Sequence, residues 1–391
     1  MKGLPVILLL VVAGALYKKN KIAWRPLLIN SSLYLTYVIT LLYTDNFKYS
    51  VDKLETGLSI LILPVIFFVF LPEFKIRPSL RTNFFKLFII STAIFSITVI
   101  VWVLIDDTTV YYKDWYSNKF RTIIKNIYLI GQHPIYASIF ISLSVILFLE
   151  LLKEKELKSF FKLSLFSLLT LVNISLLLML LSKGIVIALM IVIAFFIAKD
   201  PKVKSYKKLI FTSFFAGIIA LFIFNRRMSE LLMKETFLEV NPNFSTSIRV
   251  GVYKCTLKLI KEEWVFGYGV GDSQDALNGC YALENKLLLK GEYNTHSQYL
   301  DIVLKTGIFG LIIFLLFLSS NILKARKNNN HLAISIILFY VIAFLTENIL
   351  ARQSGVILFY FLVLFLNNKT INSNEIVSVN KEDYLTNDNL A

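Results

Sequence analysis

Charged residues are scarce in this sequence, and their scarcity decides its broad class. Asp, Glu, Lys and Arg make up 17% of the 391 residues, whereas hydrophobic residues make up 56%. Soluble domains carry about 25% charged residues, so this composition excludes a chain of soluble domains. Apolar runs long enough to cross a hydrocarbon layer of about 30 Å recur along almost the whole sequence. They do not alternate with polar residues, which excludes a β-barrel. The sequence therefore predicts an all-α polytopic integral membrane protein, because backbone groups in lipid must pair internally.

Histidine and cysteine are almost absent, with three and two residues. No His, Cys, Asp and Glu residues stand at metal-ligand spacing, and no Asp-x-Asp pair is present to hold a divalent ion with a sugar nucleotide. Neither a Ser-His-Asp arrangement nor a Walker loop is visible. The glycine-rich stretch 267–271 lies in no βαβ unit and indicates a flexible turn. We therefore expect chemistry without a metal or cofactor, and neither a hydrolase triad nor ATP-driven transport has support.

The basic residues, which give a net charge of +15, are distributed between the apolar runs. A nucleic-acid-binding protein would gather them on one face or domain, so we expect no nucleic-acid partner. Lys and Arg are instead concentrated in every second linker, namely 18–25, 72–83, 153–160, 199–207 and 324–331. By the positive-inside rule these linkers are cytoplasmic, and the other loops, including 44–56, lie outside. The stretch from Leu4 to Tyr17 lacks an Ala-x-Ala exit, so we expect no cleavable signal peptide.

About eleven spans (10–12) are predicted: 3–17, 26–43, 57–71, 84–105, 133–152, 161–181, 184–198, 208–225, 303–323, 332–346 and 354–366. The domains are N-terminal transmembrane helices at 1–225, an external loop at 226–302, C-terminal transmembrane helices at 303–366 and a polar cytoplasmic tail at 367–391. The external loop contains aromatic residues and a helix-like stretch from Ile248 to Trp264, so we expect an ordered cap. It also holds Cys255 and Cys280. An oxidising compartment permits a disulfide between them, and two free buried thiols are the alternative.

One histidine stands where the external loop enters the membrane. On a helix, His296, Tyr299, Leu300 and Val303 would share one face. An imidazole titrates near neutral pH, so His296 is the candidate general acid or base. A histidine that merely anchors a helix end among the lipid headgroups is the alternative.

Cationic residues are predicted on the same outer side: Arg121, Lys183, Arg226, Arg227, Arg249 and Arg352. Lys183 and Arg352 lie in tight turns next to hydrocarbon, where a charge is costly unless it is paired or functional. Such side chains suit a pyrophosphate, although each one singly is also explained by a side chain that extends to the headgroups. Glu347 lies five residues before Arg352 and is a partner for a cation or a simple helix-end carboxylate.

Four short patches follow one another along the chain. They are Ser-Lys-Gly at 182–184, Ser-Ile-Arg at 247–249 with Trp-Val-Phe-Gly-Tyr-Gly at 264–269, His-Ser-Gln-Tyr-Leu at 296–300 with Lys-Thr-Gly-Ile-Phe-Gly-Leu at 305–311, and the turn at 346–355. Gly-Gln-His-Pro at 131–134 is a weaker fifth. Together they resemble the O-antigen ligase and O-antigen polymerase superfamily of bacterial envelope proteins. Ser297 replaces the family's usual Asn and Lys183 its usual Arg, and the second change removes a bidentate grip on phosphate.

This resemblance implies a transferase of the bacterial inner membrane that moves a glycan from undecaprenyl pyrophosphate to an acceptor glycan, lipid or protein outside it. His296 would accept the proton of the acceptor hydroxyl, with inversion at the anomeric carbon. The implied pyrophosphate and glycan site contains Arg121, Lys183, Arg249, Tyr299, Glu347 and Arg352. Neither a metal nor a nucleotide is implied, and membrane lipids are the remaining partners.

Two alternatives stay open. Ligation to a lipid A core and polymerisation of repeat units would use the same histidine and arginine patches. A secondary transporter or flippase for an anionic solute or lipid is the competing class. It would place charges within the spans, whereas the notable polar groups here stand at the outer ends.

Overall fold

The computed structural model describes residues 6–7, 9–11, 22–72, 74–105, 118–127, 130–199, 240, 245–368 and 370. Within these residues every regular element is a helix, and one isolated parallel bridge joins Ile76 to Thr370. The predicted all-α architecture is therefore confirmed for the described part of the chain.

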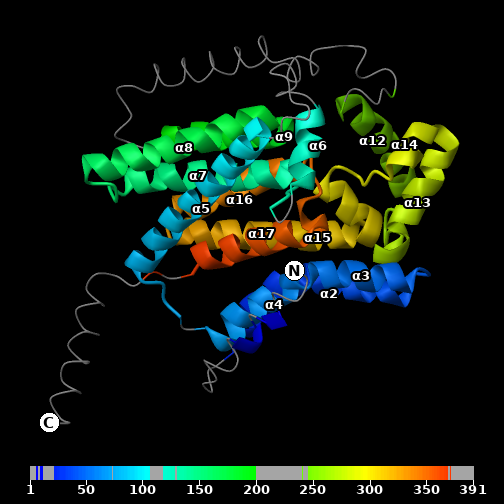
Figure 1. Cartoon of the computed structure of the whole chain (residues 1–391). Coiled ribbons are helices and arrows are strands. Elements are labelled where there is room, and N and C mark those ends of the chain that lie inside the picture. The colour runs from blue at the N-terminus through cyan, green and yellow to red at the C-terminus, as the bar shows by residue number, and fades with distance from the viewer. Residues whose placement is uncertain are drawn as a thin grey trace.

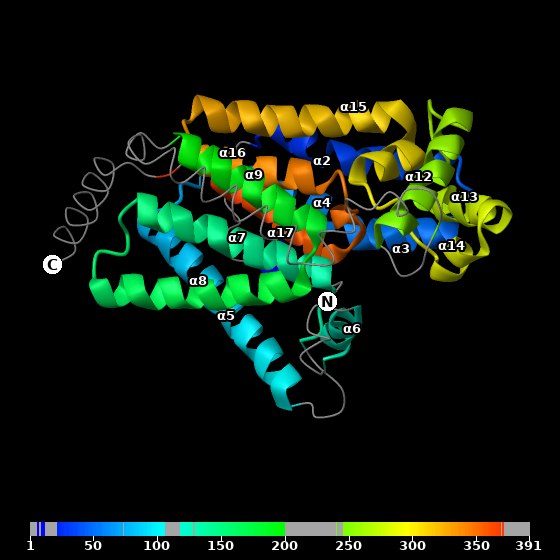
Figure 2. The ribbon, with the colours of Figure 1, turned by 90° about the horizontal axis from the view of Figure 1, so that it is seen from above.

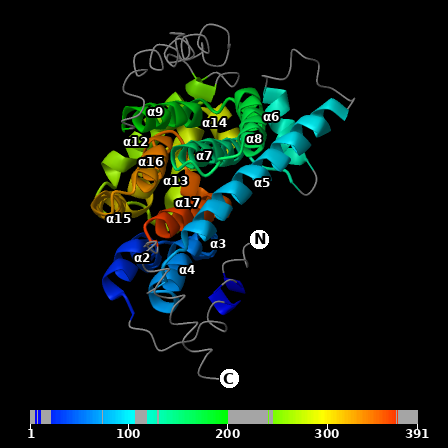
Figure 3. The ribbon, with the colours of Figure 1, turned by 90° about the vertical axis from the view of Figure 1, so that its left-hand side faces the viewer.

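The core of the molecule is a bundle of apolar helices that run side by side (Figure 1). It contains α7 (Pro134–Lys153), α8 (Phe160–Leu180), α9 (Lys183–Lys199), α15 (Gln298–Lys327), α16 (His331–Ala343) and α17 (Gln353–Leu366). Helix α5 (Pro78–Ile105) packs against α7 and α8 and crosses the bundle diagonally, as Figures 2 and 3 show. Helix α2 (Trp24–Ile39) packs on α15, and α4 (Ser59–Val65) packs on α17.

Aromatic side chains fill the space between α15, α16 and α17. The rings of Phe317 and Tyr360 are stacked with centroids 5.1 Å apart, and those of Tyr340 and Phe359 are 4.7 Å apart. These separations lie in the range where aromatic pairs add to simple burial. The three helices therefore form one rigid unit, which fixes the position of the turn between α16 and α17.

Five described helical segments are long and apolar enough to cross a membrane: Phe47–Phe70, Pro78–Ile105, Pro134–Lys153, Phe160–Leu180 and Gln298–Lys327. Three shorter apolar helices begin at Lys183, His331 and Gln353. The predicted count of about eleven spans is not confirmed. Predicted span 208–225 and most of 3–17 lie outside the described residues, and α2 has only 16 residues.

One end of the bundle is covered by a layer of helices (Figures 1 and 2). It contains α12 (Ser245–Glu262), α13 (Gly269–Glu284) and α14 (Lys286–Gly291), whereas α6 (Asn118–Asn126) lies apart from them and packs on α7. A disulfide joins Cys255 on α12 to Cys280 on α13, and both cysteines lie in a small apolar core with Val252 and Tyr281. From residue 245 to 291 the long predicted loop is thus a folded helical layer, and α12 covers most of the predicted 248–264 helix.

The prediction of a loop at 44–56 is wrong, because most of it is helix α3 (Phe47–Gly57). Asn46 caps this helix by accepting the Tyr49 N–H, and its buried positions are Ser50, Leu54 and Gly57. Only one stripe of α3 is buried, and the residues on its other sides are mostly polar. The segment as a whole is therefore too polar for its sequence to predict a membrane span. The helix packs on α13 and extends the bundle toward the covering layer.

The long helix α15 is interrupted near its start. Gly307 has φ 65° and ψ −165°, which only glycine adopts without strain. The turn after α12 fits into this interruption: Tyr268 N donates to Leu304 O (2.8 Å) and Ile308 N donates to Trp264 O (2.9 Å). A Cβ at Gly307 would collide with the Val265 carbonyl. The glycine-rich stretch predicted to be flexible is therefore fixed against α15.

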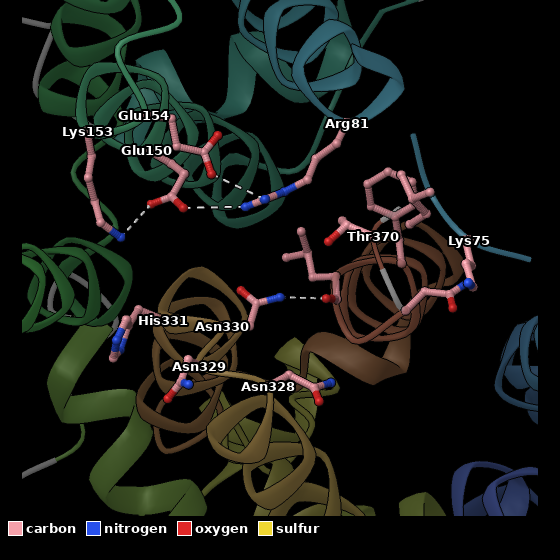
Figure 4. Close-up of a pocket in the computed structure, with 14 residues that line it drawn as sticks. Lys75, Arg81, Glu150, Lys153, Glu154, Asn328, Asn329, Asn330, His331 and Thr370 are labelled. Atoms are coloured by element: carbon pink, nitrogen blue, oxygen red, sulfur yellow. Dashed lines mark hydrogen bonds and ion pairs between the residues drawn. The ribbon is translucent and has the colours of Figure 1, made fainter. Parts of the chain in front are cut away.

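The opposite end of the bundle is held by an ionic network (Figure 4). Arg81 on α5 contacts Glu150 (3.4 Å) and Glu154 (3.2 Å), and Lys153 contacts Glu150 (3.4 Å). Asn330 Nδ2 donates to Leu366 O (2.7 Å), which ties the start of α16 to the end of α17. These groups line a pocket of about 670 Å³ with residues of three basic linkers, 72–83, 153–160 and 324–331. These three basic linkers thus gather at one end, as their alternation along the sequence predicts.

Candidate active site

Glu347 is the centre of a charged group under the covering layer. Its carboxylate accepts a hydrogen bond from Arg249 Nη2 of α12, and its second oxygen lies 3.9 Å from His296 Nδ1. The second distance is that of an ion pair rather than of a hydrogen bond. The side chain of Glu347 is 8% exposed, against 21% for Arg249 and 22% for His296. A buried carboxylate therefore brings together two residues that the sequence separates by 47 positions.

His296 does not lie on a helix, so its predicted helical face shared with Tyr299 is wrong. Helix α15 begins at Gln298, and His296 adopts a left-handed backbone with φ 49°. Its N–H donates to Asn294 Oδ1 (3.1 Å), and its carbonyl accepts from Tyr253 Oη (3.2 Å). Tyr299 points to α16 instead, where its hydroxyl donates to Val341 O (2.9 Å).

The segment around His296 is fastened to the turn that carries Glu347. Asn348 Nδ2 donates to Thr295 Oγ1 (2.9 Å), and Leu350 N donates to Gln298 Oε1 (2.8 Å). Gln298 N also donates to Phe344 O (2.9 Å). These bonds hold His296 and Glu347 at a fixed distance. Thr295 and Asn348 were not predicted, although each stands next to a predicted site residue in the sequence.

Arg121 contacts the tight turn between α8 and α9, and Lys183 directly follows that turn. Lys183 is the first residue of α9 and is 8% exposed, and its Nζ donates to Thr246 Oγ1 on α12 (3.3 Å). Arg121 Nη1 donates to Leu180 O (2.5 Å) and to Ser182 Oγ (3.4 Å). Helix α9 comes so close to the Glu347 turn that a Cβ at position 184 would collide with Thr346. The glycine is therefore needed at that position.

Arg352 and Lys125 form a further cationic group around His133. The guanidinium of Arg352 lies 5.8 Å from the ring centre of Tyr136. The side chain of His133 caps α7, with Nδ1 accepting the Ile135 N–H (3.4 Å). Burial, followed by the charges of Lys125, Arg352 and Arg121, lowers the pKa of His133 to about 3. His133 is therefore a neutral imidazole at physiological pH. Of these groups the sequence indicated Lys125 not at all and His133 only weakly.

The electrostatics of the site are set by five cations and one carboxylate among the residues that the structure describes. Burial raises the pKa of Glu347, but the Arg249 guanidinium and then His296 outweigh it and bring the pKa below its ordinary value. Glu347 is therefore ionised, and Arg249 is its partner. The side chains of Arg121, Lys125, Lys183 and Arg352 are the further cations described above, and cationic side chains are the groups that bind multiply charged anions.

Two of the predicted cations, Arg226 and Arg227, lie outside the described residues. No three His, Cys, Asp or Glu side chains gather as metal ligands would within the residues covered by the structure. Of the six predicted binding residues, the structure places Glu347 beside His296 and Arg249 on Glu347. Arg121 and Arg352 act on His133, Lys183 contacts Thr246 of α12, and Tyr299 points to α16.

Comparison with known proteins adds one finding. Residues 165–315 match the sequence model of a family described as O-antigen ligase, which confirms the resemblance predicted from the motifs. The matching range is less than half of the chain, and it contains Lys183, Arg249, His296 and both cysteines. No curated protein matches the chain.

Proposed function

We propose that this chain is a membrane glycosyltransferase of a bacterial inner membrane, because its residues 165–315 match the sequence model of the O-antigen ligase family. It moves a glycan from undecaprenyl pyrophosphate to a hydroxyl of an acceptor on the outer side of that membrane. The observation that carries this proposal is the position of Glu347 between Arg249 and His296. A buried carboxylate beside an imidazole is the arrangement that makes histidine an effective base.

The proposed reaction is a single displacement. His296 accepts the proton of the acceptor hydroxyl while that oxygen forms a bond to the anomeric carbon. The bond between the anomeric carbon and the phosphate oxygen breaks, and its electron pair stays on the undecaprenyl pyrophosphate. Attack from the opposite face inverts the anomeric centre. The pyrophosphate linkage is already activated, so no further energy source is required.

Glu347 acts as a positioning residue in this scheme. Its ionised carboxylate, 3.9 Å from Nδ1 of His296, stabilises the imidazolium that forms when Nε2 takes the proton. The segment 294–298 carries His296 on hydrogen bonds to Tyr253, Asn294 and the Glu347 turn. The imidazole of His296 is therefore already oriented before the reaction, which lowers the free energy of reorganisation needed to reach the transition state.

The cations act on the leaving group. Arg121 contacts Ser182, Lys183 contacts Thr246, and Arg352 acts with Arg121 on His133. In this scheme these three cations neutralise the charge that develops on the pyrophosphate. Arg249 shares its charge with Glu347 and so contributes less than an unpaired arginine would. Neutral His133 remains available as a donor through Nε2, because its Nδ1 accepts a backbone N–H. The polyprenyl tail lies in lipid beside the spans.

The proposal is tested by complementation in ligase-null and polymerase-null strains of the bacterium that encodes this chain. The parent chain is expected to restore the polysaccharide ladder in one of the two strains, which separates ligation from polymerisation. His296→Ala is expected to abolish the ladder at an unchanged level of protein in the membrane. Arg249→Ala is expected to do the same, because it leaves the buried Glu347 carboxylate without its partner. His331→Ala changes a histidine at the opposite end of the bundle and is expected to behave as the parent. Full restoration by His296→Ala would exclude His296 as the base.

A further inference from the structure

A second pocket adjoins the charged group on the side away from α6. It has a volume of about 410 Å³ and is lined by α3, α13, the first turns of α15 and the 3-10 turn η7 (Ile349–Ala351). In Figure 1, α6 lies above and α3 below the start of α15. The volume is within the usual range for a small-molecule site. The pocket is thus a separate space beside the proposed leaving-group cations.

Two residues connect the pocket to the active site. Asn294 lines the pocket, and its Oδ1 accepts the His296 N–H (3.1 Å). Arg352 also lines it and contributes to the field around His133. The neighbouring Tyr293 carbonyl accepts hydrogen bonds from Gln274 Nε2 (3.3 Å) and Tyr281 Oη (3.1 Å) of α13. The segment that carries His296 is therefore one wall of the pocket.

The charges that line the pocket are balanced, in contrast to the active site. The acids are Asp275, Glu292 and Asp301, and the cations are Lys53, Lys305 and Arg352. Asp301 and Lys305 neutralise each other within the pocket, with Nζ 2.6 Å from Oδ2 and side chains 8% and 14% exposed. A pocket with this balance does not select a polyanion. Its ligand is polar and carries little net charge.

The polar groups that line the pocket are both donors and acceptors of hydrogen bonds. Gln274 and Asn278 lie one turn apart on α13, and Gln274 Nε2 donates to Asn278 Oδ1 (3.1 Å). Tyr49 of α3 presents an aromatic ring, with Lys53 Nζ 4.5 Å from its centre. A sugar hydroxyl both donates and accepts, and a tyrosine combines an apolar face with a polar tip. This mixture matches a hydroxyl-rich ring better than an apolar ligand.

We propose that this pocket binds the acceptor glycan and presents one of its hydroxyls to His296. The inference rests on the proposed function, since it identifies the acceptor side of the same reaction. The donor pyrophosphate belongs with the cations near α6 and α9, and the acceptor sugar belongs between α3 and α13. Arg352 lies at the junction of the two spaces. A bound acceptor also contacts the Asn294 wall and so holds His296 in place.

The test is a binding measurement on the full-length protein in detergent, with two probes. The first is lipid-free acceptor glycan of the bacterium that encodes this chain. It is released by mild acid from lipid-linked repeat units if the complementation test shows polymerisation, and from the lipid A core if that test shows ligation. The second is inorganic pyrophosphate. Asn278→Ala and Tyr49→Leu are each expected to weaken glycan binding about tenfold, the loss of one good contact, and to leave pyrophosphate binding within about twofold. Asn328→Ala in the opposite pocket is the matched control and is expected to change neither.

The proposal is overturned if the parent protein does not bind the lipid-free glycan, or if both pocket variants bind it as the parent does. Equal weakening of both probes would also overturn it, because the pocket would then belong to the pyrophosphate site. Two variants on different helices guard against misfolding of one, and elution on a sizing column checks each. Lipid-free glycan has no leaving group, so binding does not depend on catalysis. Failure of the pocket is thereby separated from failure of His296 in the complementation test.

Discussion

At the scale of single residues, the charge of Glu347 has two consequences that oppose each other. It partners Arg249 and lies 3.9 Å from His296, so under the proposed function its negative charge would offset the positive charge that the ring gains during transfer. It also cancels part of the positive charge that a pyrophosphate would meet. The balance favours the carboxylate if proton transfer limits the reaction, because a positioned base contributes about 10² to 10⁴ in rate.

Glu347→Gln is expected to reduce the transfer rate by about 10²-fold, because the amide keeps the shape of the side chain and loses its charge. The measurement is the initial rate of glycan transfer in reconstituted membranes. The matched control is Glu150→Gln, which changes another buried glutamate with two cationic neighbours at the opposite end. We expect that control to lower thermal stability and keep the rate per folded molecule. A rate for Glu347→Gln equal to that of the parent would remove Glu347 from the mechanism.

His133 makes the stability of the protein depend on pH. Its pKa is about 3 in the folded protein and about 6.5 in an unfolded chain. As the pH falls from about 6.5 toward 3, the unfolded state takes up a proton that the folded state does not. The free energy of unfolding therefore falls by up to about 1.4 kcal/mol per pH unit in that window.

His133→Asn is expected to remove this pH dependence, since asparagine also caps a helix and does not titrate. Thermal unfolding of the detergent-solubilised protein between pH 7 and 4.5 measures it. The difference in midpoint between variant and parent should increase in favour of the variant as the pH falls. His331→Asn serves as the control and should follow the parent. Parallel curves for His133→Asn and the parent would contradict the argument.

At the scale of elements, the site depends on the interruption in α15. Backbone groups of α15 around Gly307 form hydrogen bonds with the turn after α12. These bonds fix α12, α15 and the start of α13 relative to one another. Arg249 is on α12 and His296 immediately precedes α15. A shift of this joint therefore changes the distance between the two residues that meet at Glu347.

Gly307→Ala is expected to destabilise the protein by about 1–3 kcal/mol and to lower the transfer rate as well, because its methyl group would meet the Val265 carbonyl in a backbone region reserved for glycine. Gly279→Ala is the control. Gly279 lies within α13 with no atom near its position for a Cβ, so alanine should stabilise by about 0.5–1 kcal/mol. Urea or thermal unfolding in detergent compares the two. Equal stability of both variants would show that the joint tolerates a side chain.

The apolar runs predicted the elements well wherever a helix is buried on most sides. The turn between α8 and α9 lies at Leu181 and Ser182, within one residue of its predicted place. Helix α3 was missed because only one stripe of it is buried. The interruption at Gly307 was missed because a glycine in an apolar run is ordinary in a membrane helix. The contact of Glu347 with Arg249 spans 98 residues, and no local pattern carries information of that range.

At the scale of the whole molecule, the two ends of the bundle differ in chemistry. Three basic linkers gather at one end around Arg81 and Glu150, and the disulfide and the charged site lie at the other. The positive-inside rule assigns the first end to the cytoplasm. A disulfide persists on the outer side of a bacterial inner membrane, so the second end is predicted to lie outside, which is the same orientation.

Single cysteines test this orientation, because both natural cysteines are paired. Lys286→Cys lies in the covering layer and Lys155→Cys lies in a basic linker, and both positions are exposed. A membrane-impermeant maleimide should label Lys286→Cys in intact spheroplasts and label Lys155→Cys only after lysis. The parent chain should take no label in either case. The reverse labelling pattern would show the opposite orientation, with the proposed active site facing the cytoplasm.

The two helices on either side of the Glu347 turn are short. Helix α16 has 13 residues and α17 has 14, so each rises only about 20 Å, whereas the hydrocarbon layer is about 30 Å thick. Their far ends are tied together at the basic side by Asn330 and Leu366. If these tied ends lie at one boundary of the hydrocarbon layer, the turn that carries Glu347 ends about 10 Å short of the other boundary. Under the proposed function, a lipid-linked diphosphate would then reach the site from within its own leaflet. The acceptor would have to enter below the headgroups, and a thicker bilayer would lengthen its path.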